Sequence, residues 1–215
     1  GRAALRSLSE RQYSKDQDSR LTKNGEITPV KKALLLWQAI LKEGSARPIP
    51  QRIGGPADAI ICTDGFSPDP VDVGKKPPRV GGVMFARWRS KAVCFSSIVT
   101  SRIMGRWVPR KTQIAQVELL AIVAAIETFG AELAHKRVVV LVDSESALGA
   151  AIKGYSTKQD ISDLVTRLWE TIARHRMIVY FDRISTDANI SDGPSRNDWE
   201  VAKTAMWATQ HIELD

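Results

Sequence analysis

The amino-acid sequence predicts an α/β domain built on one mixed sheet. Three short apolar segments follow one another at residues 59–63, 80–88 and 92–100, with turn residues between them, as in an antiparallel meander. Helical and strand-like segments then alternate, which is typical of parallel strands joined by helices. The strand at 138–142 is apolar at every position, as expected for a strand covered on both faces. We expect five strands, three in the meander and two parallel, with helices on both faces of the sheet.

Residues 1–55 are expected to form a basic extension that carries one helix. The first 30 residues are polar and lack apolar periodicity. Pro29 can open a helix that runs to about Leu41, with its apolar residues on one stripe. The prolines and glycines at 47–56 then indicate a linker. The compact domain is therefore expected at residues 56–215, beginning near Ala57.

After the meander, four helices and one strand are expected in addition to the strand at 138–142. Apolar residues recur at helical spacing from 113 to 129 before Gly130, and a similar stripe runs from 161 to 175. A short helix is expected at 144–153, a strand at 177–181 and a final helix at 192–212, with Pro194 in its first turn. Cys62 and Cys94 lie in apolar strands and are expected to be buried free thiols.

The net charge of +7 is unevenly distributed. Residues 1–55 carry 11 Lys/Arg against 5 Asp/Glu, no acid occurs between Asp72 and Glu118, and residues 118–215 carry 15 acids against 10 bases. A solvated basic face is the simpler interpretation of such a run. A long acid-free stretch before an acidic half also suits a phosphate-binding surface beside metal-binding carboxylates. The residues expected to contact phosphates are Arg87, Arg89, Lys91, Arg106, Arg110 and Lys111.

Three acids occupy positions that favour a metal site. Asp64 follows the first strand, Glu118 lies in the first turns of the long helix, and Asp143 follows the central strand. Each alone has a simpler explanation, as a turn residue, a helix-start acid or a helix cap. Strand-end residues of an α/β sheet point into the crevice where ligands bind. Their joint order on these elements therefore predicts a shared site.

A fourth carboxylate could come from Asp182, Asp187 or Asp192. Asp182 would lie on the last strand, where a salt bridge is the simpler role, and Asp187 lies in a loop. Asp192 stands at the start of the last helix, where backbone N–H groups favour an ionised carboxylate. A metal ligand needs fixed geometry, so we assign this role to Asp192. Asn189 is expected to brace the loop and is also counted among the residues expected to contact nucleic acid.

Four blocks of sequence resemble the ribonuclease H family: Ile-Cys-Thr-Asp-Gly-Phe at 61–66, Gln-Val-Glu-Leu-Leu-Ala at 116–121, Leu-Val-Asp-Ser-Glu-Ser-Ala-Leu at 141–148 and Asn-Ile-Ser-Asp-Gly-Pro-Ser-Arg at 189–196. The order Asp, Glu, Asp, Asp is that of the family, and the last block looks like the version found in retroelement reverse transcriptases. Residues 37–49 also resemble the segment that links polymerase to nuclease in some retroelements. The resemblance covers about residues 57–210.

The resemblance implies a ribonuclease H-like fold and endonucleolytic cleavage of the RNA strand of an RNA/DNA hybrid. Asp64, Glu118, Asp143 and Asp192 would be the catalytic metal ligands for two Mg²⁺ ions, with Mn²⁺ as a substitute. The partners would be the hybrid and an upstream reverse transcriptase domain of the same polyprotein, on which Leu34, Trp37 and Leu41 could dock if they do not dock on the domain itself. An intracellular location, cytoplasmic or nuclear, and no membrane association are expected.

The sequence departs from the family pattern in two places. Many members carry a His in the loop before the last Asp, but residues 183–189 contain none, and the three histidines of the chain are expected at the surface. Ile114 and Ala115 stand where polar residues often contact the hybrid, which leaves Gln113 and Gln116 as substitutes. These departures keep open a nuclease-inactive module that binds nucleic acid or serves a structural role, and a second alternative is another enzyme of the same fold, such as an integrase.

The expected mechanism follows from charge. Two cations about 4 Å apart need several carboxylates around them to offset their repulsion. One ion would activate the attacking water and the other would stabilise the leaving 3′ oxygen. Selectivity for a hybrid would come from 2′-OH contacts across its shallow minor groove.

Overall fold

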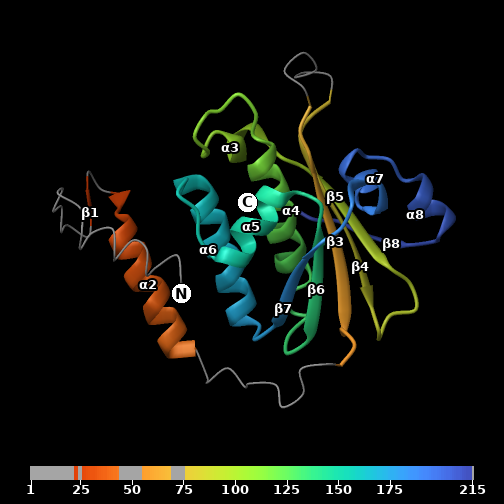
Figure 1. Cartoon of the computed structure of the whole chain (residues 1–215), viewed down its shortest axis with the longest axis horizontal. Helices are drawn as coiled ribbons and strands as arrows, with labels where there is room; N and C mark the ends of the chain where they lie inside the picture. Colours follow the sequence, from red (N-terminus) through yellow and green to blue (C-terminus); the bar gives the residue numbers. More distant parts are fainter. Residues whose placement is uncertain (1–21, 24–25, 44–54, 69–75, 215) are drawn as a thin grey trace.

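The computed structural model describes residues 22–23, 26–43, 55–68 and 76–214. Its main body is a six-stranded mixed sheet with the strand order β7-β6-β3-β4-β5-β8 (Figure 1). The strands are β3 (Ala59–Phe66), β4 (Arg79–Ala86), β5 (Val93–Ile98), β6 (Arg137–Val142), β7 (Ile178–Arg183) and β8 (Ala208–Gln210). The antiparallel β3-β4-β5 meander and the parallel β3-β6-β7 strands confirm the expected architecture. The sixth strand, β8, was not expected.

The register of the sheet brings two acids to the same edge, which is the one formed by the ends of β3 and β6. Thr63 of β3 lies beside Val142 of the parallel strand β6, so Asp64 and Asp143 follow at neighbouring strand positions. The β4–β5 turn lies at the opposite edge, because Ala59 at the start of β3 pairs with Ala86 at the end of β4. Five residues of strand separate the two edges along β3, a length of roughly 17 Å.

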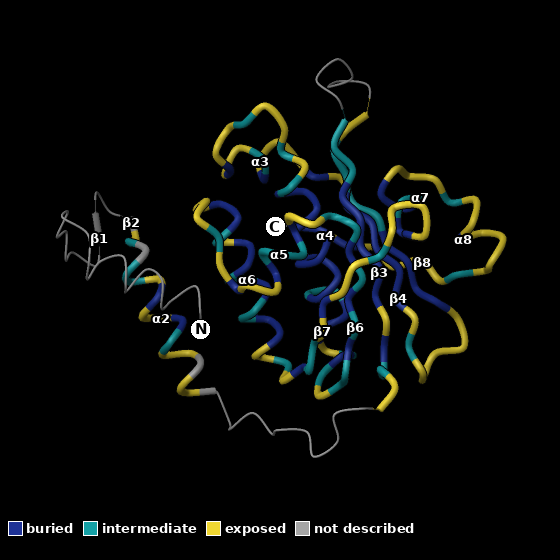
Figure 2. The backbone as a smooth tube through the Cα atoms, in the orientation of Figure 1, coloured by how far each residue is buried: buried dark blue, intermediate teal, exposed yellow. Residues whose placement is uncertain are grey.

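Helices cover both faces of the sheet, as expected (Figure 1). One face carries α4 (Ile114–Thr128), α5 (Glu145–Lys153) and α6 (Gln159–Arg174), and the short α3 (Ser101–Met104) precedes α4. The other face carries α7 (Asp192–Ser195) and α8 (Glu200–Thr204), whose Ala202 packs with Val83 and Cys94. In α4, every residue from Gln116 to Ile126 is buried, since this helix lies between the sheet and α6 (Figure 2). Apart from Gln116 and Glu118, these buried residues are apolar on all sides of the helix rather than on one stripe.

The expected final helix at 192–212 is wrong in its length. Instead the chain forms α7, α8 and the edge strand β8, which pairs in parallel with β5. Asn197 and Met206 adopt positive φ angles of 62° and 53°, and a right-handed helix cannot continue through that conformation. The Asn197 side chain accepts hydrogen bonds from Arg79 and Trp199, which stabilise the turn. The reversal brings Trp199 and Trp207 over the second face of the sheet.

Helix α2 (Pro29–Glu43) forms where the sequence predicts it, beside α6. Its buried residues are Ala33 and Leu36, with Trp37 half-buried. The expectation that Leu34 and Leu41 make the docking contact is not met within this chain, because they remain 46% and 76% exposed. Of the three residues predicted to dock, only Trp37 belongs to this cluster, and the other contacts come from Ala33 and Leu36.

Both cysteines are buried free thiols, as expected, and burial raises the pKa of Cys62 to about 11.

In the described ranges, no helix combines the length and the apolar character needed to cross a lipid bilayer.

We predict that a chain beginning at Gly55 folds without the extension. The α2 helix adds a small cluster separate from the main core, and its ion pair between Lys32 and Asp163 is exposed. Exposed ion pairs contribute little, so the truncation should lower the free energy of unfolding by only about 1–2 kcal/mol. Urea unfolding of both chains measures this difference. A truncated chain without a cooperative transition would place α2 in the core.

Candidate metal centre

Three carboxylates from three elements meet at one edge of the sheet. Asp64 comes from the end of β3, Glu118 from the second turn of α4, and Asp143 from the residue after β6. One oxygen atom of each lies within 4.8 Å of the others. The three acids singled out from the sequence therefore form one cluster, although they are separated by up to 79 residues along the chain.

Each carboxylate has a different environment. The backbone N–H of Gly65 donates a hydrogen bond of 3.1 Å to Oε2 of Glu118. The Ser195 hydroxyl of α7 donates to Oδ2 of Asp64, so elements on both faces of the sheet contribute to the cluster. By contrast, Oδ1 of Asp143 is buried and has no hydrogen-bond partner. An unpaired buried oxygen is costly, and a cation bound there would satisfy it.

Two glycines allow the helices to approach the strand that carries Asp64. A Cβ atom on Gly65 would lie 2.5 Å from the backbone nitrogen of Glu118 on one face. On the other face, Gly81 pairs with Asp64 across the ladder, and a Cβ there would overlap the backbone of Ser195. Larger residues at these two positions would push Glu118 and Ser195 away from Asp64.

We predict that Gly81→Ala destabilises the fold and displaces α7. The added methyl group meets backbone rather than a flexible side chain, so the cost should be about 3 kcal/mol. Gly149→Ala is the matched control, because a Cβ there has nothing within 4 Å and alanine is the better helix former in α5. The control should gain about 0.5–1 kcal/mol. Chemical denaturation of both variants measures the contrast, and equal effects would contradict it.

The electrostatics of the cluster reflect burial of like charges. Desolvation, followed by the charges of Asp64 and Asp143, raises the pKa of Glu118 to about 9. Desolvation also raises the pKa of Asp64, although the Ser195 hydrogen bond acts in the opposite direction. Without a cation, the cluster therefore holds a proton at neutral pH. Carboxylate oxygens are the ligands that hard divalent cations prefer, so these residues fit such an ion.

We predict that Glu118→Gln stabilises the metal-free protein, and more so at higher pH. The folded wild type holds a proton on Glu118 up to pH about 9, whereas the unfolded chain loses it near 4.5. Wild-type stability therefore falls as pH rises through this window, and glutamine removes that dependence. With EDTA present, the gain should be below about 1 kcal/mol at pH 5 and up to about 4 kcal/mol greater at pH 8. The same gain at both values would contradict the cause given.

The three candidates for a fourth carboxylate are placed differently. Asp192 opens α7, contributes to the raised pKa values of Asp64 and Glu118, and pairs with Arg196 at 2.7 Å. Asp182 is exposed on β7 and accepts a hydrogen bond from the N–H of Arg183. Asp187 is exposed in the 3₁₀ turn η2 (Thr186–Ala188). Of the three, Asp192 alone lines the cavity at the cluster.

The cluster opens into a cavity of about 560 Å³ with cations on its wall. Asp64, Glu118 and Asp143 line it, together with Lys76 and Arg196. The Arg196 guanidinium lies over the ring of Phe66, 5.0 Å from its centroid, which holds this cation beside the carboxylates. Within the described residues, no histidine lines the cavity.

The basic residues expected to contact phosphates are divided between the two edges of the sheet. The β4–β5 turn carries Arg87, Arg89 and Lys91, so the structure does not bring them to the carboxylates. Arg89 there forms an ion pair of 2.5 Å with Glu132. Arg106 and Lys111 are exposed in the segment between α3 and α4. This segment lies at the end of the sheet where β3 ends (Figure 1).

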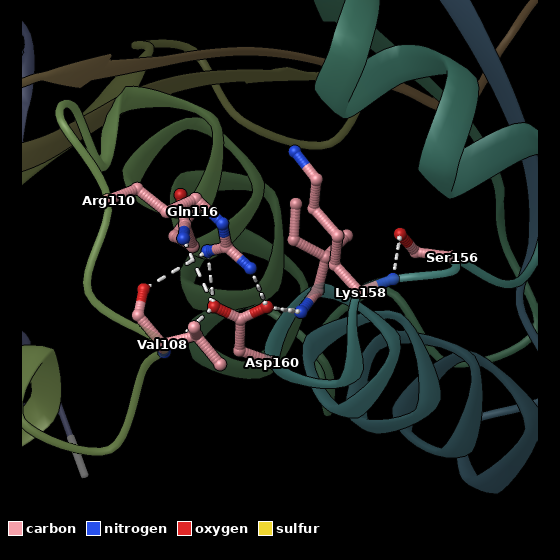
Figure 3. Close-up of polar contacts among 7 residues, drawn as sticks. Val108, Arg110, Gln116, Ser156, Lys158 and Asp160 are labelled. Carbon is pink, nitrogen blue, oxygen red and sulfur yellow. Dashed lines mark hydrogen bonds and ion pairs between the residues drawn. The ribbon is translucent and has the colours of Figure 1, made fainter.

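Three other predicted contact residues are engaged inside the protein. Arg110 and Gln116 both donate to the buried carboxylate of Asp160 (Figure 3). The amide of buried Asn189 donates 3.1 Å to the backbone oxygen of Thr63, which ties the loop before α7 to β3 and fits the predicted bracing role. Gln113 is the N-cap residue of α4, and its Oε1 is buried without a hydrogen-bond partner.

Sequence reasoning missed Ser195 and Asp160. Ser195 lies in the quoted block at 189–196, but only the fold brings its hydroxyl to Asp64. Asp160 looks like an ordinary acid in the first turn of α6. Neither residue carries a local signal of its contacts, since the partner of Ser195 is 131 residues away and that of Asp160 is 50 away.

The fold and site define a mixed α/β domain with a buried carboxylate cluster. The sequence matches no protein-family model and no curated protein. In structure, the chain is similar to ribonuclease H1 from the archaeon Halobacterium salinarum, with 16% identity over 63% of this chain and 92% of that one, at a TM-score of 0.48. It is also similar to the N-terminal RNase H domain of a Mycobacterium tuberculosis protein, with 16% identity over 70% and 99% of the chains and a TM-score of 0.48. A ribonuclease H1 isolated from compost has 19% identity over 64% and 91%, with a TM-score of 0.45.

Proposed function

We propose that this chain is a metal-dependent endonuclease that cuts the RNA strand of RNA/DNA hybrids, as the ribonuclease H domain of a reverse transcriptase. The observation that carries the proposal is the meeting of Asp64, Glu118 and Asp143, with one buried Asp143 oxygen left unpaired. Three carboxylates this close together, two of them buried and one half-buried, are tolerable only with protons or cations among them. The motif blocks that contain these acids resemble the same family.

Two Mg²⁺ ions, or Mn²⁺ in their place, would when bound supply an activated water and stabilisation of the leaving oxygen. The role of the chain is to hold the ligands in place. Asp64 and Glu118 are fixed by Ser195 and the Gly65 amide, while Asp143 offers its free oxygen. Asp192 lies farther out and half-exposed, so we assign it to the second ion. Its release from Arg196 would leave that guanidinium beside the cavity for a substrate phosphate.

The substrate is assigned from the chemistry of the cavity. Lys76 and Arg196 on its wall, with exposed Arg106 and Lys111 nearby, suit the phosphates of a duplex. Gln113 and Ile114 begin the helix that carries Glu118, where contacts to the minor groove of a hybrid are expected. Arg87, Arg89 and Lys91, on the opposite edge, would contact only a more distant part of the nucleic acid.

We predict that Asp64→Asn, Glu118→Gln and Asp143→Asn each lower cleavage of a labelled RNA/DNA hybrid in Mg²⁺ by at least about 10³-fold, because each removes a ligand charge. Asp192→Asn should lower the rate less and raise the Mg²⁺ concentration needed for half-maximal rate. Wild-type protein in EDTA should not cut. Gel analysis of the labelled strand measures all four variants.

Asp182→Asn and Asp187→Asn are matched controls on neighbouring exposed acids and should cut at the wild-type rate. Wild-type cleavage by two of the three cluster variants would contradict the metal assignment. A wild type that binds the hybrid but does not cut it in Mg²⁺ or Mn²⁺ would instead support a nuclease-inactive binding module. Loss of activity in Asp187→Asn with retention in Asp192→Asn would exchange their roles.

A further inference from the structure

A second buried carboxylate, outside the metal centre, joins three segments of the chain (Figure 3). Asp160, the second residue of α6, is only 5% exposed. Its oxygens accept two hydrogen bonds from the guanidinium of Arg110, at 2.5 and 2.8 Å, and one of 3.1 Å from the side-chain amide of Gln116. The backbone N–H groups of Val108 and Ile161 donate two more, at 3.1 and 3.0 Å.

This carboxylate is well satisfied in its ionised form. Burial by itself raises the pKa of Asp160, but the hydrogen bonds from Arg110, Ile161 and Val108 outweigh it and bring the pKa below its usual value. A bidentate Arg–carboxylate pair defines geometry as well as contributing energy. Among the other donors to Asp160, Val108 lies in the segment before α4 and Gln116 lies in α4 itself. Asp160 is therefore a rigid attachment point for that segment.

The attached segment leads directly into the metal centre. Gln116 is two residues before Glu118, and Ile114 lines the cavity. Helix α4 begins without a side-chain cap hydrogen bond at Gln113, so its first turn has no local anchor of that kind. Asp160 anchors the residues on either side of this point, at 108–110 and at 116.

Between these two anchors lies an exposed cation. Lys111 directly follows Arg110 and is exposed, as is Thr112. A chain held at both ends over so few residues has few alternative shapes, so the position of the Lys111 backbone is determined largely by Asp160. The flexible side chain of Lys111 can then reach a phosphate with little loss of backbone entropy.

We propose that Asp160 is a positioning residue for substrate binding: it holds residues 108–116 in the shape that presents Lys111 to a phosphate of the nucleic-acid duplex next to the metal centre. The inference rests on the proposed function for the identity of the duplex. Asp160 does not touch the reacting atoms. It acts through Arg110 and the Val108 backbone on one side and through Gln116 on the other.

The test compares Asp160→Asn with Asp163→Asn, an exposed acid one turn later on α6. Asp160→Asn should raise the KM for the hybrid about tenfold, the loss of one charged phosphate contact, while kcat changes less than about twofold. The slope of log KM against log salt should fall by about one. Asp163→Asn should match the wild type. All assays are run well below the melting temperature of each variant.

Lys111→Ala should reproduce both effects, and adding it to Asp160→Asn should change KM no further, because the two act through one contact. A variant with a lower melting temperature but wild-type KM and salt slope would overturn the proposal and leave Asp160 a purely structural residue. Additive effects of the two substitutions would overturn the route through Lys111.

Amide hydrogen exchange separates this inference from the proposed function. In the full chain without substrate, Asp160→Asn should speed exchange at Val108 and at the amides of 114–117 at least about tenfold, and Asp163→Asn should not. Unchanged exchange would overturn the positioning role even if the protein cuts hybrids. Faster exchange in a protein that neither binds nor cuts a hybrid would overturn the proposed function while the anchoring of this segment stands.

Discussion

Repulsion among three neighbouring carboxylates, two of them buried and one half-buried, is the constraint around which this domain is organised. Asp64, Glu118 and Asp143 would separate in water, yet the sheet register and the packing of α4 hold their oxygens within 4.8 Å of one another. The unfavourable free energy of this arrangement is seen in the raised pKa of Glu118 and in the unpaired oxygen of Asp143. Such local strain persists only where the surrounding structure outweighs it. Here the surroundings are the apolar core between the sheet and α4.

Helices approach strand β3, which carries Asp64, closely on both of its faces. Gly65 brings the backbone of α4 against one face of β3, and Gly81 leaves room for α7 at the other. The two short-range contacts to the cluster, from the Gly65 amide and the Ser195 hydroxyl, depend on these approaches. The centre is thus built mostly from backbone geometry, and its side chains need little freedom of their own. Asp160 extends this order to the segment before α4.

Local sequence patterns were sufficient to predict the elements whose structure depends mainly on their own residues. The meander, the helix that ends near Gly130 and the apolar strand at 138–142 were all predictable, because length, periodicity and turn residues are local properties. The last helix was not, since Asn197 adopts its left-handed conformation with hydrogen bonds from Arg79 and Trp199. Likewise, Arg110 and Gln116 look like phosphate and groove contacts in the sequence but turn inward to a carboxylate 50 and 44 residues away.

The sequence by itself determined the order of the main strands and helices from β3 to β7 and the identity of the three clustered acids, because strand-end and helix-start positions are visible in the pattern. Tertiary structure alone decided which cations lie near them. It placed Arg87, Arg89 and Lys91 at the far edge of the sheet, since the β4 register brings the turn back to the start of β3. It also placed Arg196 over Phe66 at the cavity. A run of like charges in the sequence shows which charged residues are present. Where each of them lies in the folded protein depends on strand pairing between residues far apart in the chain.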